Sequence, residues 1–113
     1  MTRRMTIYDA YGSTKAAEIT FDARVTSRAS FFYGTHTHCE HEAFDAQTPA
    51  GPVHIVDNVA LAPRIPVQPG DRIRVRGEMV HDPGAMPVVH WTHHDPAGRH
   101  PGGFIELHGR VYA

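Results

Sequence analysis

Histidine is the residue type with the most capacity for chemistry in this sequence, because the 113-residue chain contains 10 of them. They are concentrated in two internal stretches, residues 36–41 and residues 90–100. A neutral imidazole binds divalent transition-metal ions, and a nearby carboxylate serves as a further ligand or orients the ring. Three or four such groups satisfy zinc, whereas two histidines and a carboxylate suit iron with open positions. The clustering therefore predicts a histidine-rich polar site for a divalent metal, zinc or iron, or for a small anionic ligand.

The candidate ligands are five histidines and one aspartate, which we expect to converge on one polar pocket. They are His41, His90, His93, His94, Asp95 and His100. We expect three further residues to support the site, namely Trp91, Asn58 and Arg64. The other members of the first stretch, His36 and His38, are expected to face solvent. Cys39 is expected to pack as a small apolar residue, because a single cysteine cannot build a thiolate-rich zinc site.

The spacing of these histidines matches no established metal signature. The second stretch is not the His-Glu-x-x-His pattern of helical zinc proteases, because its surroundings do not predict a helix. A metal-free alternative is a structural plug, in which the histidines hydrogen-bond across the end of the fold with Trp91 packed beneath them. The sequence contains no nucleophile-elbow, phosphate-loop or dinucleotide-binding motif, so it supports none of those enzyme classes. Whether the protein is an enzyme is left open.

Alternating apolar and polar residues predict β-strands on both sides of these histidines. The most regular strand is expected at residues 73–79, where Ile73 and Val75 alternate with arginines. The other expected strands cover residues 19–25 (continuing with a bend to 31–32), 39–46, 53–59, 88–92 and 104–112, the last with a turn at 108–109. A short sheet must close on itself or leave its edges exposed. We therefore expect an all-β fold, a small OB-fold-like barrel of five or six strands over residues 18–113, after a short irregular or helical arm over residues 1–17.

The composition restricts the location and partners of the protein. Eleven Lys and Arg against 12 Asp and Glu give a formal net charge of −1, so no overall field attracts polyanions. A single cysteine suits a reducing compartment, and no apolar run approaches the roughly 18 residues of a membrane span. The first residues lack the apolar stretch of a secretory signal. We expect a cytoplasmic protein without a membrane partner, and the sequence does not indicate its oligomeric state.

The alternative function is an OB-fold module that binds single-stranded nucleic acid or a protein partner. Arg72, Arg74 and Arg76 form a stripe on one strand face, and aromatic side chains such as Phe31 and Trp91 offer stacking surfaces. Neighbouring glutamates and the near-neutral net charge dilute this stripe. Nucleic acid is therefore the less favoured partner.

The run His-Trp-Thr-His-His-Asp-Pro at residues 90–96, followed by Gly98-x-His100 and a Gly-Gly pair, is the most distinctive motif. With Asn58, the Pro-Gly-Asp at 69–71 and the terminal Gly-Arg-x-Tyr, it resembles the signature of a family of small bacterial proteins of unknown function. The resemblance covers residues 34–112 approximately. A His-x-x-Phe element of that family matches His41 and Phe44, so the resemblance favours His41 within the first stretch. Because the family has no assigned activity, it implies no reaction.

Overall fold

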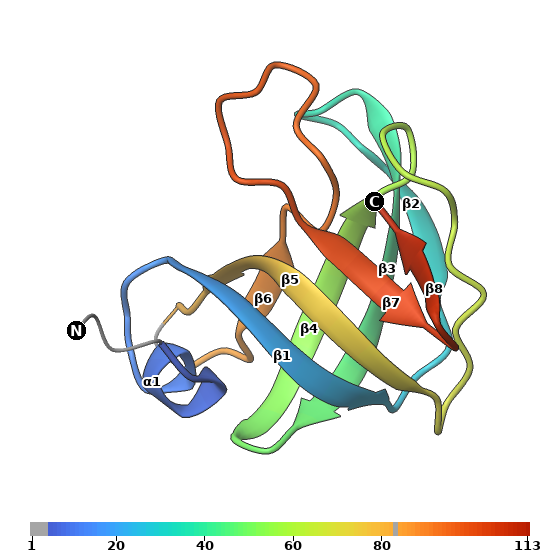
Figure 1. Ribbon diagram of the computed structural model, residues 1–113. Coiled ribbons are helices and arrows are strands. Elements are labelled where there is room, and N and C mark those ends of the chain that lie inside the picture. The colour runs from blue at the N-terminus through green and yellow to red at the C-terminus, as the bar shows by residue number, and fades with distance from the viewer. Residues whose placement is uncertain (1–4, 83) are drawn as a thin grey trace.

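The structure, a computed structural model, describes residues 5–82 and 84–113 and consists almost entirely of β-strands (Figure 1). One short helix precedes the strands along the described chain. The elements are α1 (Ile7–Tyr11), β1 (Ala17–Val25), β2 (Ser30–Gly34), β3 (Cys39–Thr48), β4 (Gly51–Asn58), β5 (Arg72–Val80), β6 (Val88–His90), β7 (Phe104–Leu107) and β8 (Arg110–Tyr112).

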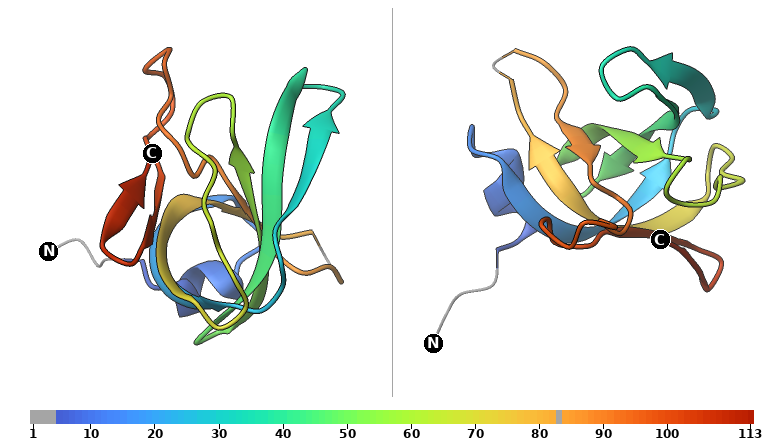
Figure 2. Two further views of the ribbon diagram at one scale, coloured as in Figure 1. Left: turned by 90° about the vertical axis from the view of Figure 1, so that its right-hand side faces the viewer. Right: turned by 90° about the horizontal axis from the view of Figure 1, so that it is seen from above.

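Five of these strands form a closed barrel, in the order β1-β3-β4-β6-β5, with β5 pairing back to β1. The β4–β6 pair is parallel, and the other four neighbouring pairs of the barrel are antiparallel. Figure 2 shows these strands wrapping around one enclosed interior. Closure pairs the strand edges that an open sheet of this size would expose. The predicted all-β, OB-fold-like barrel is confirmed.

The barrel interior is filled by the apolar residues that alternate along each strand. On β5, Ile73, Val75 and Met79 are buried, whereas the charged residues between them face outward. Burying one such side chain stabilises the fold by about 1.5–3 kcal/mol, before entropy is subtracted. Gly77 occupies the remaining inward position of β5, where a Cβ atom would lie 2.7 Å from the carbonyl oxygen of His90. The absence of a side chain there lets β6 cross close to β5.

The first strand is broken rather than simply bent. β1 ends at Val25, and the chain leaves the sheet over residues 26–29 before β2 pairs with the other half of β3. At the break, the Asp45 amide donates to the hydroxyl oxygen of Ser27, and the Thr26 amide donates to the Asp45 carbonyl. These bonds replace regular ladder bonds, so the expected continuous strand to residues 31–32 becomes two strands.

The N-terminal arm is a helix docked on the barrel. Thr6 caps α1, with Asp9 completing a reciprocal capping box. Ile7 and Ala10 are buried in the core, and the Tyr11 hydroxyl donates to the Pro52 carbonyl at 3.0 Å. No helix among the described residues is long and apolar enough to cross a membrane.

The chain after β6 leaves the barrel as an extended loop, residues 91–103, which we call the histidine loop. It lies at the end of the barrel opposite α1 (Figures 1 and 2). The expected strand at 88–92 ends early, at His90, because Trp91 adopts a left-handed backbone with φ of 56°. After the loop, β7 pairs with β5 outside the closed barrel, and β8 pairs with β7. The expected turn at His108–Gly109 is present, with both residues at positive φ.

Candidate functional site

A row of polar residues crosses three neighbouring strands on the outer face of the barrel. Glu18 of β1 is the direct cross-strand partner of Glu78 of β5, and Glu78 is also the partner of His90 of β6. All three side chains alternate with buried neighbours, so the same pattern that fills the core directs them outward. Two carboxylates directly opposite one another repel, and a cation or a proton between them would relieve that repulsion.

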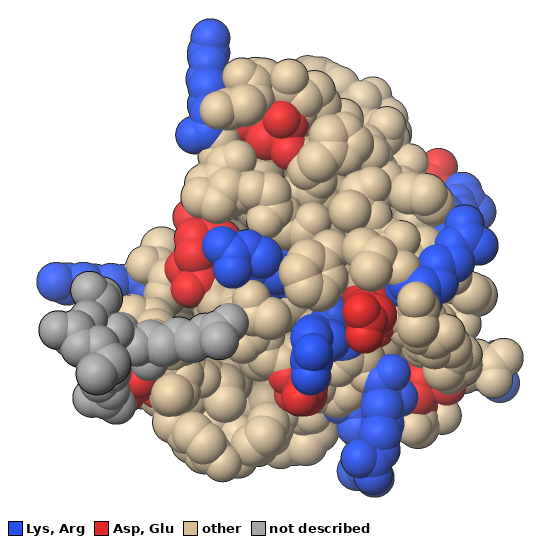
Figure 3. Space-filling model, in the orientation of Figure 1, with Lys and Arg blue, Asp and Glu red and all other residues tan. Residues whose placement is uncertain are grey.

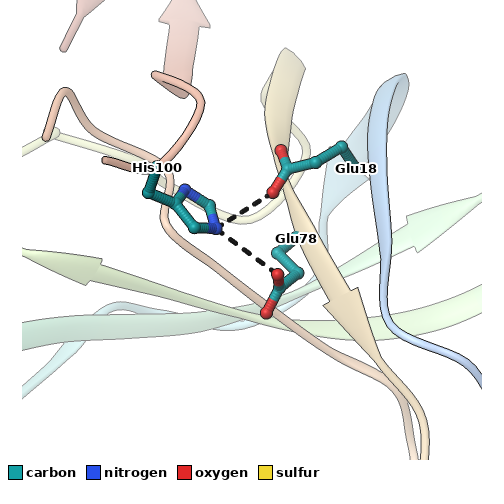
Figure 4. Close-up of side chains that lie close together, drawn as sticks. All are labelled: Glu18, Glu78 and His100. Atoms are coloured by element: carbon teal, nitrogen blue, oxygen red, sulfur yellow. Dashed lines mark hydrogen bonds and ion pairs between the residues drawn. The ribbon is translucent and has the colours of Figure 1, made fainter. Parts of the chain in front are cut away.

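The histidine loop brings His100 onto this acidic pair (Figure 4). His100 Nε2 lies 3.2 Å from Glu18 Oε1 and 3.4 Å from Glu78 Oε2. The second oxygen of Glu78, Oε1, accepts from His90 Nε2 at 2.9 Å. We call Glu18, Glu78 and His100 the acidic–histidine cluster. Two of its members, Glu18 and His100, are 82 positions apart along the chain (100 − 18).

The electrostatic balance of the cluster favours positive charge. Both Glu18 oxygens are shielded from solvent, and neither accepts a hydrogen bond from a described residue, because the approach of His100 lacks hydrogen-bond geometry. Burial lowers the pKa of His100. Hydrogen bonds to Pro101 and Glu78 and the charges of both glutamates outweigh that effect and raise the pKa above its ordinary value. A protonated imidazole or a metal ion satisfies the same two carboxylates.

Asp95 organises the loop rather than facing the cluster. Its carboxylate accepts from the backbone amides of Ala97, Arg99 and His100, each at 2.9 Å. Backbone hydrogen bonds, the Ala97 bond first, hold the pKa of Asp95 below its ordinary value. The Gly103 amide donates to the His93 carbonyl at 2.9 Å and closes the base of the loop. Asp95 therefore fixes the backbone position from which His100 reaches the glutamates.

Trp91 lies between two histidines of the loop. Its ring stacks on His100 at a centroid distance of 4.1 Å and is tilted against His93 at 5.4 Å. A Cβ atom at Gly103 would collide with the carbonyl oxygens of Trp91 and Arg76, so the loop can return to β5 only through a glycine. The indole thus packs directly against the His100 ring.

A second pocket, lined by both polar and apolar side chains, includes Trp91 in its wall. It has a volume of about 240 Å³ and is lined by Thr37, His41, Val56, Asn58, Leu61, His90, Trp91 and His93. His41 Nδ1 donates to the Cys39 carbonyl, and His93 Nδ1 donates to the His94 carbonyl at 2.7 Å. Carbonyl oxygens only accept, so each bonded Nδ1 carries a hydrogen, and in the neutral form of such a ring Nε2 is the acceptor. Burial lowers the pKa of His93, which keeps this ring neutral near pH 7.

The structure divides the expected site residues among different places. His41, His90, His93, Trp91 and Asn58 line the second pocket, whereas His100 belongs to the acidic–histidine cluster. His94 is exposed, and Asp95 binds backbone amides. Arg64 lies elsewhere, paired with Glu40 and stacked over Phe31. The expected single convergence of six ligands is therefore not observed, although His90 lines the second pocket and also bonds Glu78 of the cluster.

Sequence reasoning missed both glutamates of the cluster. Glu18 and Glu78 each occupy an outward position on a strand, where a charged residue ordinarily signals only solvent. Their proximity depends on the β1–β5 register, which pairs residues 60 positions apart (78 − 18). The sequence shows that each of the two strands carries a glutamate at an outward position. It does not show that the two glutamates are cross-strand partners. His36 and His38 are exposed, as expected.

A second acidic pair lies inside the barrel. Glu42 and Asp57 are cross-strand partners on β3 and β4, and both are fully buried. Glu42 Oε1 accepts from the Ile65 amide at 2.8 Å, and Asp57 Oδ1 accepts from the Thr92 hydroxyl at 3.1 Å. Their other oxygens, Glu42 Oε2 and Asp57 Oδ2, have no hydrogen-bond partner among the described residues. We call these two residues the inner acidic pair.

Burial raises the pKa of both members of the inner acidic pair. For Asp57 the pKa rises from 3.8 to about 6, because burial outweighs the hydrogen bonds from Thr92 and the Asn58 backbone. For Glu42, burial is again the largest cause, partly opposed by the Ile65 amide and reinforced by the charge of Asp57. Asp57 faces inward on β4, in alternation with the buried Val53 and Ile55.

The cluster has dimensions suitable for a metal ion. Among residues 5–82 and 84–113, Glu18, Glu78 and His100 form the group of three potential ligands whose atoms all lie within 4.8 Å of one another. Tetrahedral zinc with bonds of about 2.0–2.1 Å places neighbouring ligand atoms about 3.3 Å apart. The separations of 3.2 and 3.4 Å from His100 fit that geometry. His90, bonded to the far oxygen of Glu78, occupies the position of an orienting partner.

The arginine stripe on β5 is largely engaged. Arg74 forms an ion pair with Asp22 at 2.9 Å, and Arg76 donates to the Gly102 carbonyl and to Thr20. On the face shown in Figure 3, basic side chains are interspersed with acidic ones rather than joined in one patch. The described residues on this face therefore form no continuous basic surface for a phosphate backbone.

Comparisons with known proteins place the chain in a family without an assigned role. A family model described as "Protein of unknown function (DUF3465)" matches residues 22–113, and the chain belongs to that family. No curated protein matches it. The crystal structure of the tetrameric p202 HIN2 is similar, with a TM-score of 0.59 and 14% identity over 94% of this chain and 49% of that chain. This chain spans about half the length of that one, and the likeness shows the fold alone.

Proposed function

We propose that this member of the DUF3465 family binds a divalent transition-metal ion, zinc or iron, at the acidic–histidine cluster. The observation that carries the proposal is the meeting of Glu18, Glu78 and His100 within ligand distance of one another. One imidazole and two carboxylates form a mixed donor set that suits zinc and ferrous iron. Three protein ligands leave a coordination position open for water or a small ligand.

The surroundings of the cluster support a preorganised site. His90 binds Glu78 Oε1, which leaves Oε2 directed at His100, and the Trp91 stack holds the imidazole ring. Partners of this kind orient ligands and typically alter metal affinity by about 10–100-fold. The unbonded oxygens of Glu18 add negative charge that a bound cation would neutralise.

Calorimetric titration of zinc into untagged, chelator-treated protein tests the proposal. The expected result is one saturable site that is lost in Glu78→Gln and His100→Ala. Glu106→Gln on β7 and His36→Ala in the exposed turn are matched controls that should keep it. Occupancy should fall between neutral pH and about pH 5, because protons compete for the imidazole nitrogen. Absence of binding by both zinc and ferrous iron would contradict the proposal and leave a metal-free ionic lock between His100 and the glutamates.

Single-stranded nucleic acid is the second candidate ligand, favoured by the OB-fold-like barrel and by the exposed rings of Phe31, Phe32 and Tyr33. It has less support, because Arg74 and Arg76 already bind residues of the same protein. Non-specific phosphate contacts would give weak binding that collapses as salt rises. Tight oligonucleotide binding that survives high salt and is lost in Arg74→Ala would reverse this ranking.

A further inference from the structure

A hollow lies where β1 ends beside the start of β5, remote from the acidic–histidine cluster (Figure 1). It has a volume of about 630 Å³, and residues of β1, β3, β5 and β7 line it. Arg24 and Arg72 are cross-strand partners in this hollow, six residues along both strands from the Glu18–Glu78 pair (24 − 18 and 78 − 72). At about 3.3 Å per residue, the two pairs are about 20 Å apart. We call this hollow the arginine pocket.

The first row of outward-facing residues in the arginine pocket is balanced in charge. Arg74 of β5 is the cross-strand partner of Asp22 on β1 and of Glu106 on β7. Arg74 Nε donates to Asp22 Oδ1 at 2.9 Å. One guanidinium therefore lies between two carboxylates, and this row needs no further anion.

The second row, two residues nearer the end of the strand pair, is not balanced. Arg24 of β1 has Gln47 of β3 as its partner on one side and Arg72 of β5 on the other. Neither guanidinium forms an ion pair or a hydrogen bond with a described residue. Like charges directly opposite one another destabilise a strand pair. An anion between Arg24 and Arg72 would replace that repulsion with attraction to both.

Two further hydrogen-bond donors line the arginine pocket. Gln47 Nε2 donates one hydrogen to the Thr48 carbonyl at 3.2 Å, and its amide has a second hydrogen for a ligand. His108, at the turn between β7 and β8, has a side chain that is 73% exposed. Its Nε2 lies 3.6 Å from Asp71 Oδ1, which is too long for a hydrogen bond, so this nitrogen can also contact a ligand.

The composition of the pocket favours one compact anion with several oxygens. A planar guanidinium binds two oxygens at once, so one arginine saturates a carboxylate, whereas two arginines match the oxygens of a phosphate group. Asp22 and Glu106 line the same pocket, and Asp71 lies beside His108, so a chain of consecutive phosphates would meet carboxylates. The volume lies within the range of small-molecule sites, about 300–1,000 Å³, which leaves room for an organic part beyond the phosphate.

We propose that the arginine pocket binds a small phosphate monoester, with the phosphate group held between Arg24 and Arg72. Gln47 donates to a third phosphate oxygen, and the organic part occupies the remainder of the pocket. The neighbouring carboxylates exclude longer polyanions. This pocket is separate from the acidic–histidine cluster, so the inference does not depend on metal binding.

Titration of phenyl phosphate into chelator-treated, isotope-labelled protein at physiological salt, followed by NMR, tests the inference. The chelator removes any metal that could bind the phosphate instead. The expected result is a saturable shift of the side-chain Nε–H signals of Arg24 and Arg72. Arg24→Gln and Arg72→Gln should each weaken binding at least about tenfold, because charge-assisted hydrogen bonds are lost. Arg99→Gln, which removes an exposed arginine of the histidine loop, should bind like the native protein.

Two comparisons separate recognition of a phosphate group from general attraction of anions. Phenyl sulfate has a similar shape and one negative charge fewer, so it should bind several-fold more weakly than phenyl phosphate. Without ligand, Arg24→Gln and Arg72→Gln should unfold at the temperature of the native protein or above it, because each substitution relieves the repulsion between the two arginines. Their loss of binding is then not a loss of fold.

Several results would overturn the inference. They are no saturable binding at millimolar phenyl phosphate, unchanged affinity in both arginine variants, and equal affinity for phenyl phosphate and phenyl sulfate. A large loss of thermal stability in both unliganded variants would show that the arginines already have partners within the protein. Much tighter binding of oligothymidylate or of a phosphoserine peptide, lost in the same variants, would assign the pocket to a macromolecule instead.

Discussion

The barrel contains two acidic pairs with the same local construction and different surroundings. Glu18 and Glu78 face each other across β1 and β5, as Glu42 and Asp57 do across β3 and β4. The outer pair receives His100 from the histidine loop, whereas the inner pair receives backbone amide and hydroxyl donors. The comparison teaches that two opposed acidic pairs differ in the partner that reaches them: a titratable imidazole at the outer pair and uncharged donors at the inner pair.

The two pairs should therefore respond to acid in opposite directions. Under the proposed metal binding, protons should compete with the metal at the outer pair, so acid should remove metal-dependent stability there. The inner pair binds protons more tightly when folded, because the Asp57 pKa is about 6 in the fold against 3.8 ordinarily. Its contribution to stability is greatest below the unfolded pKa and is lost as the pH rises through about 6.

The largest expected effect comes from removing the buried charge with Asp57→Asn. Ionising this carboxyl in the fold costs on the order of 3 kcal/mol at pH 8, since each pKa unit corresponds to about 1.4 kcal/mol. Chelator-treated Asp57→Asn should therefore equal or exceed the native protein in urea-unfolding stability at pH 8 and vary less between pH 5 and 8. A variant that is much less stable at pH 8, with unchanged pH dependence, would show that the charge is already satisfied.

The next effect is zinc-dependent thermal stabilisation. A ligand bound only by the folded state contributes about 2.7 kcal/mol at a free concentration 100 times its Kd. For a domain of this size, such an increment raises the Tm by on the order of 10 °C. Differential scanning fluorimetry at pH 7.5 should show this rise in the native protein and none in His100→Ala. The control His54→Ala disrupts only the ion pair with Asp45 and should retain the rise.

A smaller effect is expected from the partner that orients Glu78. His90→Ala removes the donor to Glu78 Oε1 and should weaken zinc binding by about 10–100-fold. His90→Gln offers an amide donor and should recover part of that affinity. Competition with a fluorescent zinc chelator measures both. Equal zinc affinities of the native protein and His90→Ala would show that His90 does not orient Glu78 for zinc binding.

The smallest expected effect separates cluster histidines from exposed ones. His94 is exposed although it is adjacent in sequence to the buried His93. His94→Ala should change unfolding stability by less than about 0.5 kcal/mol, as for surface substitutions generally, and should leave zinc affinity unchanged. A large loss of zinc affinity in this variant would restore the single, six-ligand site expected from the sequence.

The strands could be predicted from the sequence because alternation records directly which side chains face the core. On β5, the buried Ile73, Val75 and Met79 stand at the expected positions. The break between β1 and β2 depends on the hydrogen bond from the Asp45 amide to the Ser27 hydroxyl, and no local sequence pattern predicts that bond. The early end of β6 depends likewise on the backbone of Trp91.

The candidate site was predictable only in part, because register is a property of the whole sheet. Histidine clustering drew attention to His90 and His100, and the structure places Trp91 against His100 and His90 against Glu78. The position of Glu18 opposite Glu78 follows from barrel closure between β1 and β5. Asp95 was expected to be a ligand, but its position at the turn gives its oxygens three backbone amides instead.

Anomalous X-ray diffraction at the zinc absorption edge, on crystals grown with zinc at neutral pH, tests the central claim most directly. The predicted result is one strong peak enclosed by Glu18, Glu78 and His100, with His90 still bonded to Glu78. No comparable peak is expected at the exposed His36 and His38. A peak confined to the exposed histidines, or none while His100 continues to bridge the two glutamates, would contradict metal binding and establish the cluster as an ionic lock.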